Sequence, residues 1–151
     1  MNDLSPEHCH TLLNRGMVGH MGVISDGKPY VSPISYVMVG GAVCLRTGRG
    51  ERVDALTANP SVCIEVSEVD ENTGAWQSVI AWGKAEFVED DGTAREIIAA
   101  ILEKYRSVLG SPLSPGTVFP EPGVVVRVPI EGISGRESGS FFSARTRPGR
   151  L

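Results

Sequence analysis

Three arginines in seven residues, Arg46, Arg49 and Arg52, follow an apolar segment and lead into a short helical pattern. Gly48 and Gly50 lie between them. Arginine donates paired hydrogen bonds to phosphate oxygens, and glycine lets the backbone approach a ligand closely. A helix that begins near residue 51 would add free backbone N–H groups, which attract anions. The segment therefore predicts a site for a small anion such as a phosphate. The alternative is a solvated loop in which the arginines only offset nearby acidic residues.

The composition favours one globular domain with a small ligand. The chain has 151 residues, 41% of them hydrophobic and 21% charged, which is typical of a single folded domain. Its formal net charge of −4 argues against nucleic acid or an anionic membrane as a partner. No apolar run approaches the roughly 20 residues that span a bilayer, and the N-terminal residues lack the pattern of a secretory signal. We therefore expect a cytoplasmic protein.

The histidines and cysteines do not indicate a metal site or a disulfide framework. His8 and His10 are two positions apart, so on a helix their side chains point in nearly opposite directions. Three scattered cysteines are too few for a set of disulfide bridges. We expect no bound metal.

Hydrophobic periodicity and turn residues divide the chain into strands with a few helices. Ser5 and Pro6 are typical of a helix start, and Asp26-Gly27 is a strong hairpin signal. Gly83 indicates a bulge, and Pro33 an edge, a bulge or a bend. The expected helices cover residues 4–16, 50–60 and 90–110. The expected strands cover residues 17–25, 28–39, 42–47, 61–69, 76–90 and 124–135, with 76–90 either one long strand or a bent pair.

Strands in hairpin order predict a mainly β domain with an antiparallel sheet and flanking α-helices. Closure of that sheet into a barrel would remove its exposed edges. A proline-rich loop is expected at residues 111–123, and a flexible tail rich in Arg, Ser and Gly at residues 137–151. No internal repeat or second domain is indicated.

Several segments, in this order, carry a resemblance to a known family: "DGKPYVSPISYVM", "LRTGRGERVDAL", "NPSVCIEVSEVDENTGAWQSVIAWGKAEFVED" and "VVVRVPIEGISGRES". Over roughly residues 4–136 the chain resembles the pyridoxamine-phosphate-oxidase-like flavoproteins, also called the flavin-binding split-barrel family. Within that family it looks most like the branch of the nitroimidazole-resistance proteins. The resemblance implies a six-stranded antiparallel split β-barrel at residues 1–136. It also implies a homodimer with flavin mononucleotide (FMN) between the subunits.

The resemblance also implies which residues bind the cofactor. The segment around residues 46–52 would hold the ribityl chain and the phosphate, with Arg52 as the family's usual cation. Glu51 departs from the oxidases proper, which have a basic residue there, so Arg46 or Arg49 would supply the second cation. The implied cofactor-binding residues are Pro33, Ile34, Ser35 and Tyr36 at the ring, Arg46, Thr47, Arg49, Gly50 and Arg52 at the ribityl chain and phosphate, and Gln77 and Ser78 from the neighbouring strand.

A second departure concerns the reaction. The oxidases proper carry an Arg-x-His pair near the C-terminus that holds pyridoxamine phosphate, whereas all three histidines here lie in the first 20 residues. We therefore expect an FMN-dependent oxidoreductase that passes electrons from a reduced nicotinamide to a small-molecule acceptor, and not a pyridoxamine-phosphate oxidase. The alternatives are a reductase that uses a deazaflavin coenzyme, or a non-enzymatic protein that binds flavin or haem. Phe141 and Phe142 in the tail are expected to cover the site if the tail is ordered.

Overall fold

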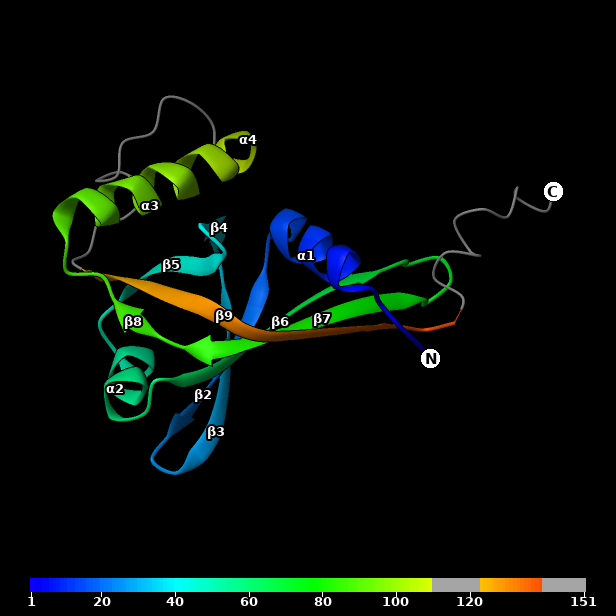
Figure 1. Cartoon of the computed structure of the whole chain (residues 1–151), viewed down its shortest axis with the longest axis horizontal. Coiled ribbons are helices and arrows are strands. Elements are labelled where there is room, and N and C mark those ends of the chain that lie inside the picture. The colour runs from blue at the N-terminus through cyan, green and yellow to red at the C-terminus, as the bar shows by residue number, and fades with distance from the viewer. Residues whose placement is uncertain (110–122, 140–151) are drawn as a thin grey trace.

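The computed structural model describes residues 1–109 and 123–139, and the loop at 110–122 and the tail at 140–151 lie outside that description. The described residues form nine strands and four helices (Figure 1). The strands are β1 Asn2–Asp3, β2 Gly19–Ser25, β3 Lys28–Ile34, β4 Val37–Val39, β5 Ala42–Gly48, β6 Ser61–Val69, β7 Trp76–Lys84, β8 Glu86–Phe87 and β9 Gly123–Glu137. The helices are α1 Pro6–Arg15, α2 Glu51–Ala58, α3 Asp91–Lys104 and α4 Arg106–Leu109.

All strand pairs are antiparallel, in the order β3-β2-β6-β7-β9-β5-β4, with β1 and β8 also paired to β9. Strand β9 is 15 residues long and belongs to both halves of the curled sheet. Its first part pairs with β5, from Gly123 opposite Gly48 to Pro129 opposite Ala42, and its second part pairs with β7. Figure 1 shows β9 crossing the molecule between these two halves. The expected antiparallel split barrel is confirmed.

Local turn and cap chemistry explains most element boundaries. Ser5 caps α1 by accepting a hydrogen bond from the backbone N–H of His8. Asp26 and Gly27 both have positive φ, 49° and 72°, as a two-residue hairpin turn requires. The expected bulge is present between Trp82 and Gly83. Gly83 is also required sterically, because a Cβ atom there would lie 2.2 Å from the carbonyl oxygen of Pro129.

The single strand expected at residues 28–39 is wrong, because the structure divides it into β3 and β4. Strand β3 pairs with β2 at one end of the sheet order, whereas β4 pairs with β5 at the other end. Ser35 and Tyr36 form the bend at which the chain passes from one half of the sheet to the other. This division, together with the two-residue strands β1 and β8, accounts for nine strands where six were expected.

The main core lies between the curled sheet and α1, and a second apolar cluster lies under α3. Leu12 and Leu13 of α1 are fully buried in the main core. Ile97 and Ile101 of α3 pack with Cys44 of β5 in the second cluster, and Figure 1 shows α3 over that half of the sheet. Helix α3 therefore covers the face of β5 that points away from the main core.

Strand β9 extends beyond the expected end at residue 135 and includes Arg136 and Glu137. The expected proline-rich loop and most of the expected tail, with Phe141 and Phe142, lie outside the described residues. In the described part of the chain, no helix combines the length and apolar character that crossing a membrane requires.

Candidate functional site

Arg52, in the first turn of α2, ties together three elements that are distant in sequence. Its Nη2 donates to Ser32 Oγ at 2.7 Å and to the carbonyl oxygen of Pro33 at 3.0 Å, both on β3. Its Nη1 donates to Thr47 Oγ1 on β5 at 3.0 Å. The structure therefore brings together Pro33, Thr47 and Arg52, three of the expected site residues. The guanidinium stands where β3, β5 and α2 meet.

Arg52 retains capacity to bind an anion. Its Nε is buried and has no hydrogen-bond partner among the described residues. No carboxylate in residues 1–109 or 123–139 forms an ion pair with it. Burial lowers the pKa of Arg52, and interaction with Tyr30 partly opposes that shift, but a guanidinium stays charged at any physiological pH. The cluster thus presents a positive charge that the described protein groups leave unbalanced.

The loop beside Arg52 is open. A Cβ atom at Gly48 or Gly50 would meet nothing within 4 Å, and Arg49 is exposed between them. Gly50 is the N-cap of α2 and offers no side chain, so the first-turn amides of α2 receive no side-chain cap. The Glu51 carboxylate accepts a hydrogen bond from Ser25 Oγ at 3.2 Å. An anion could therefore reach the amides of α2 and Arg52 from the solvent side.

Arg46 and Thr47 are neighbours on β5 and point to opposite faces of the strand. Thr47 continues the row of Val43 and Leu45 into the main core and is only 8% exposed. Arg46 continues the opposite row, and its guanidinium covers Gly123, where a Cβ atom would lie 2.6 Å from Arg46 Cζ. Thr47 therefore contacts Arg52, and Arg46 lies on the opposite face of β5.

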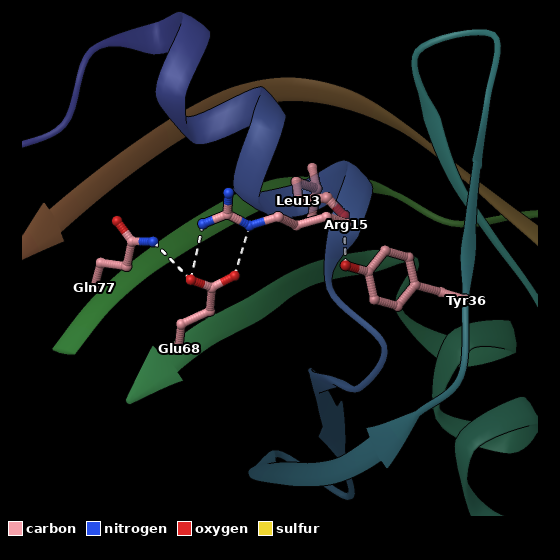
Figure 2. Close-up of polar contacts among 5 residues, drawn as sticks. All are labelled: Leu13, Arg15, Tyr36, Glu68 and Gln77. Atoms are coloured by element: carbon pink, nitrogen blue, oxygen red, sulfur yellow. Dashed lines mark hydrogen bonds and ion pairs between the residues drawn. The ribbon is translucent and has the colours of Figure 1, made fainter. Parts of the chain in front are cut away.

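The side chains of the segment Pro33–Tyr36, which was expected at the flavin ring, alternate between exposed and buried positions. Pro33 and Ser35 are exposed, whereas the side chains of Ile34 and Tyr36 are buried in the main core. The Tyr36 hydroxyl donates to the carbonyl oxygen of Leu13, and Figure 2 shows the ring pointing at α1. Burial raises the pKa of Tyr36. Ile34 and Tyr36 can therefore offer a ligand only backbone groups.

The side chains of Gln77 and Ser78 point to opposite faces of β7. Gln77 is fully buried, and its Nε2 donates to Glu68 Oε2 at 2.9 Å (Figure 2). Glu68 accepts two further hydrogen bonds from Arg15, at 2.6 and 2.8 Å. Ser78 lies on the opposite face, where its hydroxyl donates to Glu65 Oε1 at 2.7 Å. The period of two in a strand is visible in the sequence, and it already indicates that two consecutive residues cannot both face one ligand.

The face of β2, β3, β6 and β7 opposite the core exposes large apolar side chains. Val31 is 67% exposed, Trp82 44% and Ile80 42%. A groove of about 510 Å³ crosses this face, with His20, Ile24, Tyr30, Val31, Cys63 and Glu65 among its lining residues. A smaller hollow of about 370 Å³ is lined by Trp76, Ser78, Ile80, Ser134, Gly135 and Arg136. Ser78 therefore opens onto this outer face, away from the Arg52 cluster.

Comparison with known proteins identifies the family to which this fold belongs. A family model described as pyridoxamine 5'-phosphate oxidase matches residues 5–137. The chain belongs to this family. The match covers every described helix and all strands except β1, and the resemblance inferred from the sequence is confirmed.

Individual proteins are similar to this chain over most of its length. The chain is 29% identical over 142 residues to an uncharacterized protein of Rhizobium meliloti (strain 1021). This match covers 92% of this chain and 85% of the relative. The chain is 28% identical to an FAD-binding protein of Mesorhizobium loti, with a TM-score of 0.73 and coverage of 91% and 98%. A candidate 5-nitroimidazole antibiotic resistance protein from Bacteroides thetaiotaomicron has a TM-score of 0.76 at 21% identity, with coverage of 90% and 86%, and shows the shared fold.

Two residues of this family member that the sequence did not single out for the site are Lys104 and Tyr105. They lie at the C-terminal end of α3, and both hydrogen-bond to the backbone of Tyr36. Both lie within the helix that the sequence predicted at residues 90–110. No local pattern could have revealed the contact, because Lys104 is 68 positions away from Tyr36 in the sequence.

Proposed function

We propose that this protein binds a flavin, FMN, with the phosphate at the Arg52 cluster. The observation that carries the proposal is the half-buried Arg52 guanidinium, which no described carboxylate neutralises and whose Nε has no described partner. It stands beside the uncapped N-terminus of α2 and an open loop. A phosphate monoester would bind both the guanidinium and the N-terminus of α2, because it accepts hydrogen bonds from the guanidinium and from backbone amides. Arg49 in the loop would add a second, more mobile cation.

The ring of the flavin would lie along the segment Pro33–Ser35. This segment begins at the carbonyl group that Arg52 holds, and it presents Pro33 and Ser35 to solvent. We further propose that a second copy of the chain covers the outer sheet face, where Val31, Ile80 and Trp82 are exposed. Contiguous apolar side chains of this size on neighbouring strands are typical of an interface. In such a homodimer Ser78 of one copy could face the flavin of the other.

When bound, the flavin supplies two-electron redox chemistry, and the protein supplies binding and orientation. We propose an oxidoreductase that takes electrons from a reduced nicotinamide and passes them to a small-molecule acceptor. Oxidation of pyridoxamine phosphate is disfavoured, because no histidine follows residue 20 in this chain. A deazaflavin coenzyme would place similar demands on the anion cluster and remains an alternative ligand of the same site.

A haem is the second candidate ligand, and the outer groove favours it. His20 lies in that groove among largely apolar residues, and its Nδ1 lies 3.5 Å from Glu65 Oε2. That contact leaves Nε2 as the possible axial ligand, an arrangement that orients a histidine toward a metal. The flavin proposal and the haem proposal therefore concern different faces of the molecule.

The absorption spectrum of the purified protein tests the proposal, followed by titration of the ligand-free protein. Flavin bands, and tighter binding of FMN than of riboflavin, are the expected result. A Soret band that is lost in His20→Ala would instead support haem. Reduction of the bound flavin by NADH or NADPH without oxygen tests the oxidoreductase step. A protein that binds FMN, but is reduced by neither nicotinamide, would be a flavin carrier or would use another donor.

A further inference from the structure

Two side chains at the C-terminal end of α3 form hydrogen bonds with the bend between β3 and β4. Lys104 Nζ donates to the carbonyl oxygen of Tyr36 at 2.9 Å and to that of Gly16 at 2.6 Å. The Tyr105 hydroxyl donates to the carbonyl oxygen of Met17 at 2.6 Å, and it accepts a hydrogen bond from the backbone N–H of Tyr36 at 3.0 Å. Both backbone groups of Tyr36 are therefore held, and the same two side chains tie the bend to the segment that follows α1.

The Lys104 ammonium is also packed against aromatic rings. Nζ lies 3.9 Å from the centroid of the Tyr36 ring and 5.5 Å from that of the Tyr105 ring, within range of a cation–π attraction. Gly16 permits this packing, because a Cβ atom there would lie 2.6 Å from the Tyr36 hydroxyl. The contacts are specific for a positive group with several donors.

Lys104 is the ionisable group of this cluster that titrates closest to neutrality. Burial lowers its pKa to about 8. Among the described residues, the other titratable groups in contact with it are the phenols of Tyr36 and Tyr105. Two charged residues near it are already paired, since Arg15 of α1 binds Glu68 and Arg106 of α4 binds Glu103 of α3.

The segment Pro33–Tyr36 is thus held by a cation at each end. Arg52 binds the carbonyl group of Pro33, and Lys104 binds the carbonyl group of Tyr36. Pro33 and Ser35, which point outward, lie between these two anchors. A charged donor makes a hydrogen bond roughly twice as strong as a neutral one, so the Lys104 anchor weakens when the ammonium loses its proton.

We propose that Lys104, assisted by Tyr105, is a positioning residue that holds the bend at Ser35–Tyr36 in the shape that receives the flavin ring, so that flavin affinity depends on the charge of Lys104. This inference rests on the proposed flavin site. Arg52 keeps its charge throughout, and the phosphate of FMN is fully ionised above pH 7. Between pH 7 and pH 9 the bend is therefore expected to loosen while the phosphate contacts persist.

The test is FMN affinity at pH 7 and pH 9 for the wild type, Lys104→Arg, Lys104→Met and a control, Lys84→Met, at an exposed lysine. A group that titrates near pH 8 changes from about 90% to about 10% charged over this interval, so wild-type affinity should fall by up to ~10-fold. Lys104→Arg should show no such fall, because the guanidinium stays charged. Lys104→Met should bind weakly at both pH values, and Lys84→Met should behave as the wild type.

The inference is overturned if Lys104→Met binds FMN as tightly as the wild type, or if Lys104→Arg keeps the wild-type dependence on pH. Should Lys104→Met fail to fold, Tyr105→Phe removes only the hydroxyl that Tyr36 uses. Several-fold weaker binding by this variant supports the inference, and wild-type affinity contradicts it.

A readout without ligand separates this inference from the proposed function. The peptide groups that contain the carbonyls of Gly16 and Tyr36 end in the amides of Met17 and Val37. In NMR spectra of the ligand-free wild type these two amides should titrate together near pH 8, and in Lys104→Arg they should not. If the wild type binds no flavin, the proposed function fails. If the two amides do not titrate, the Lys104 anchor itself is wrong.

Discussion

Replacing Arg52 by alanine tests the proposed phosphate site most directly. The substitution removes the guanidinium that contacts Ser32, Pro33 and Thr47, and with it the cation offered to the ligand. Arg49→Ala is the matched comparison, because Arg49 also carries a positive charge but is exposed in the open glycine loop.

 This substitution removes a like charge two residues before α2 begins, and among the described residues it breaks no hydrogen bond to β3 or β5.

The expected size of the effect follows from the contacts. A charged hydrogen bond contributes about 1.5–3 kcal/mol, so loss of the phosphate contact should weaken FMN binding by ~10- to 100-fold. Two of the three contacts within the protein are partly buried and the third is exposed, so their loss should reduce the free energy of unfolding by about 1–2 kcal/mol. Arg49→Ala should change affinity by less than about threefold, since exposed charges contribute little.

The assay is titration of ligand-free protein with FMN and with riboflavin, which lacks the phosphate. Wild-type protein and Arg49→Ala should prefer FMN, and Arg52→Ala should lose most of that preference. Arg52→Lys keeps the charge but not the paired geometry, so its preference should be intermediate. If Arg52→Ala keeps wild-type affinity for FMN while remaining folded, the phosphate does not bind at Arg52.

Three further outcomes are expected. Folding lowers the pKa of Lys104 from 10.5 to about 8, so its contribution to stability is present above pH 10.5 and is lost as the pH falls to about 8. As the pH rises from 8 to 10.5, the free energy of unfolding of the wild type should increase by about 1 kcal/mol relative to that of Lys104→Met, a value that allows for solvent screening. If the two free energies change with pH in parallel, the pKa of Lys104 is not lowered in the folded protein. Gly83→Ala should lower the free energy of unfolding by about 1–3 kcal/mol because its Cβ would meet the carbonyl oxygen of Pro129. Gly92→Ala, at the start of α3, should be nearly neutral, because its Cβ would meet only the Asp90 side chain, at an ordinary contact distance of 3.4 Å. Light scattering should give twice the 16.1 kDa chain mass, and Trp82→Glu should shift the mass toward that of one chain; a monomeric wild type would contradict the proposed interface.

The features that the sequence predicted well are those that local chemistry determines. The cap at Ser5, the turn at Asp26-Gly27 and the bulge at Gly83 each depend on residues close together in the chain. The division of residues 28–39 at Ser35–Tyr36 was missed, because it depends on which distant strand each part pairs with.

The predicted site residues show the same limit. Sequence position placed Arg52, Thr47 and Pro33 in one site, and the hydrogen bonds join them. Position alone ignores the alternation of side chains along a strand, so it grouped Gln77, which is buried, with Ser78, which faces outward. Whether these residues bind a cofactor stays a prediction.

The position of β9 in the chain has a consequence for how the protein folds. The hairpins β2–β3 and β4–β5 and the pair β6–β7 can each form before residue 123 is synthesised, but β7 and β5 are joined in the described sheet only through β9. Until the final strand arrives, β7 and β5 keep unpaired edges, which invite association with other chains. Pairing between distant segments is also slow. Chaperone dependence and aggregation of nascent protein should therefore be concentrated in the interval between synthesis of β7 and release of β9 from the ribosome.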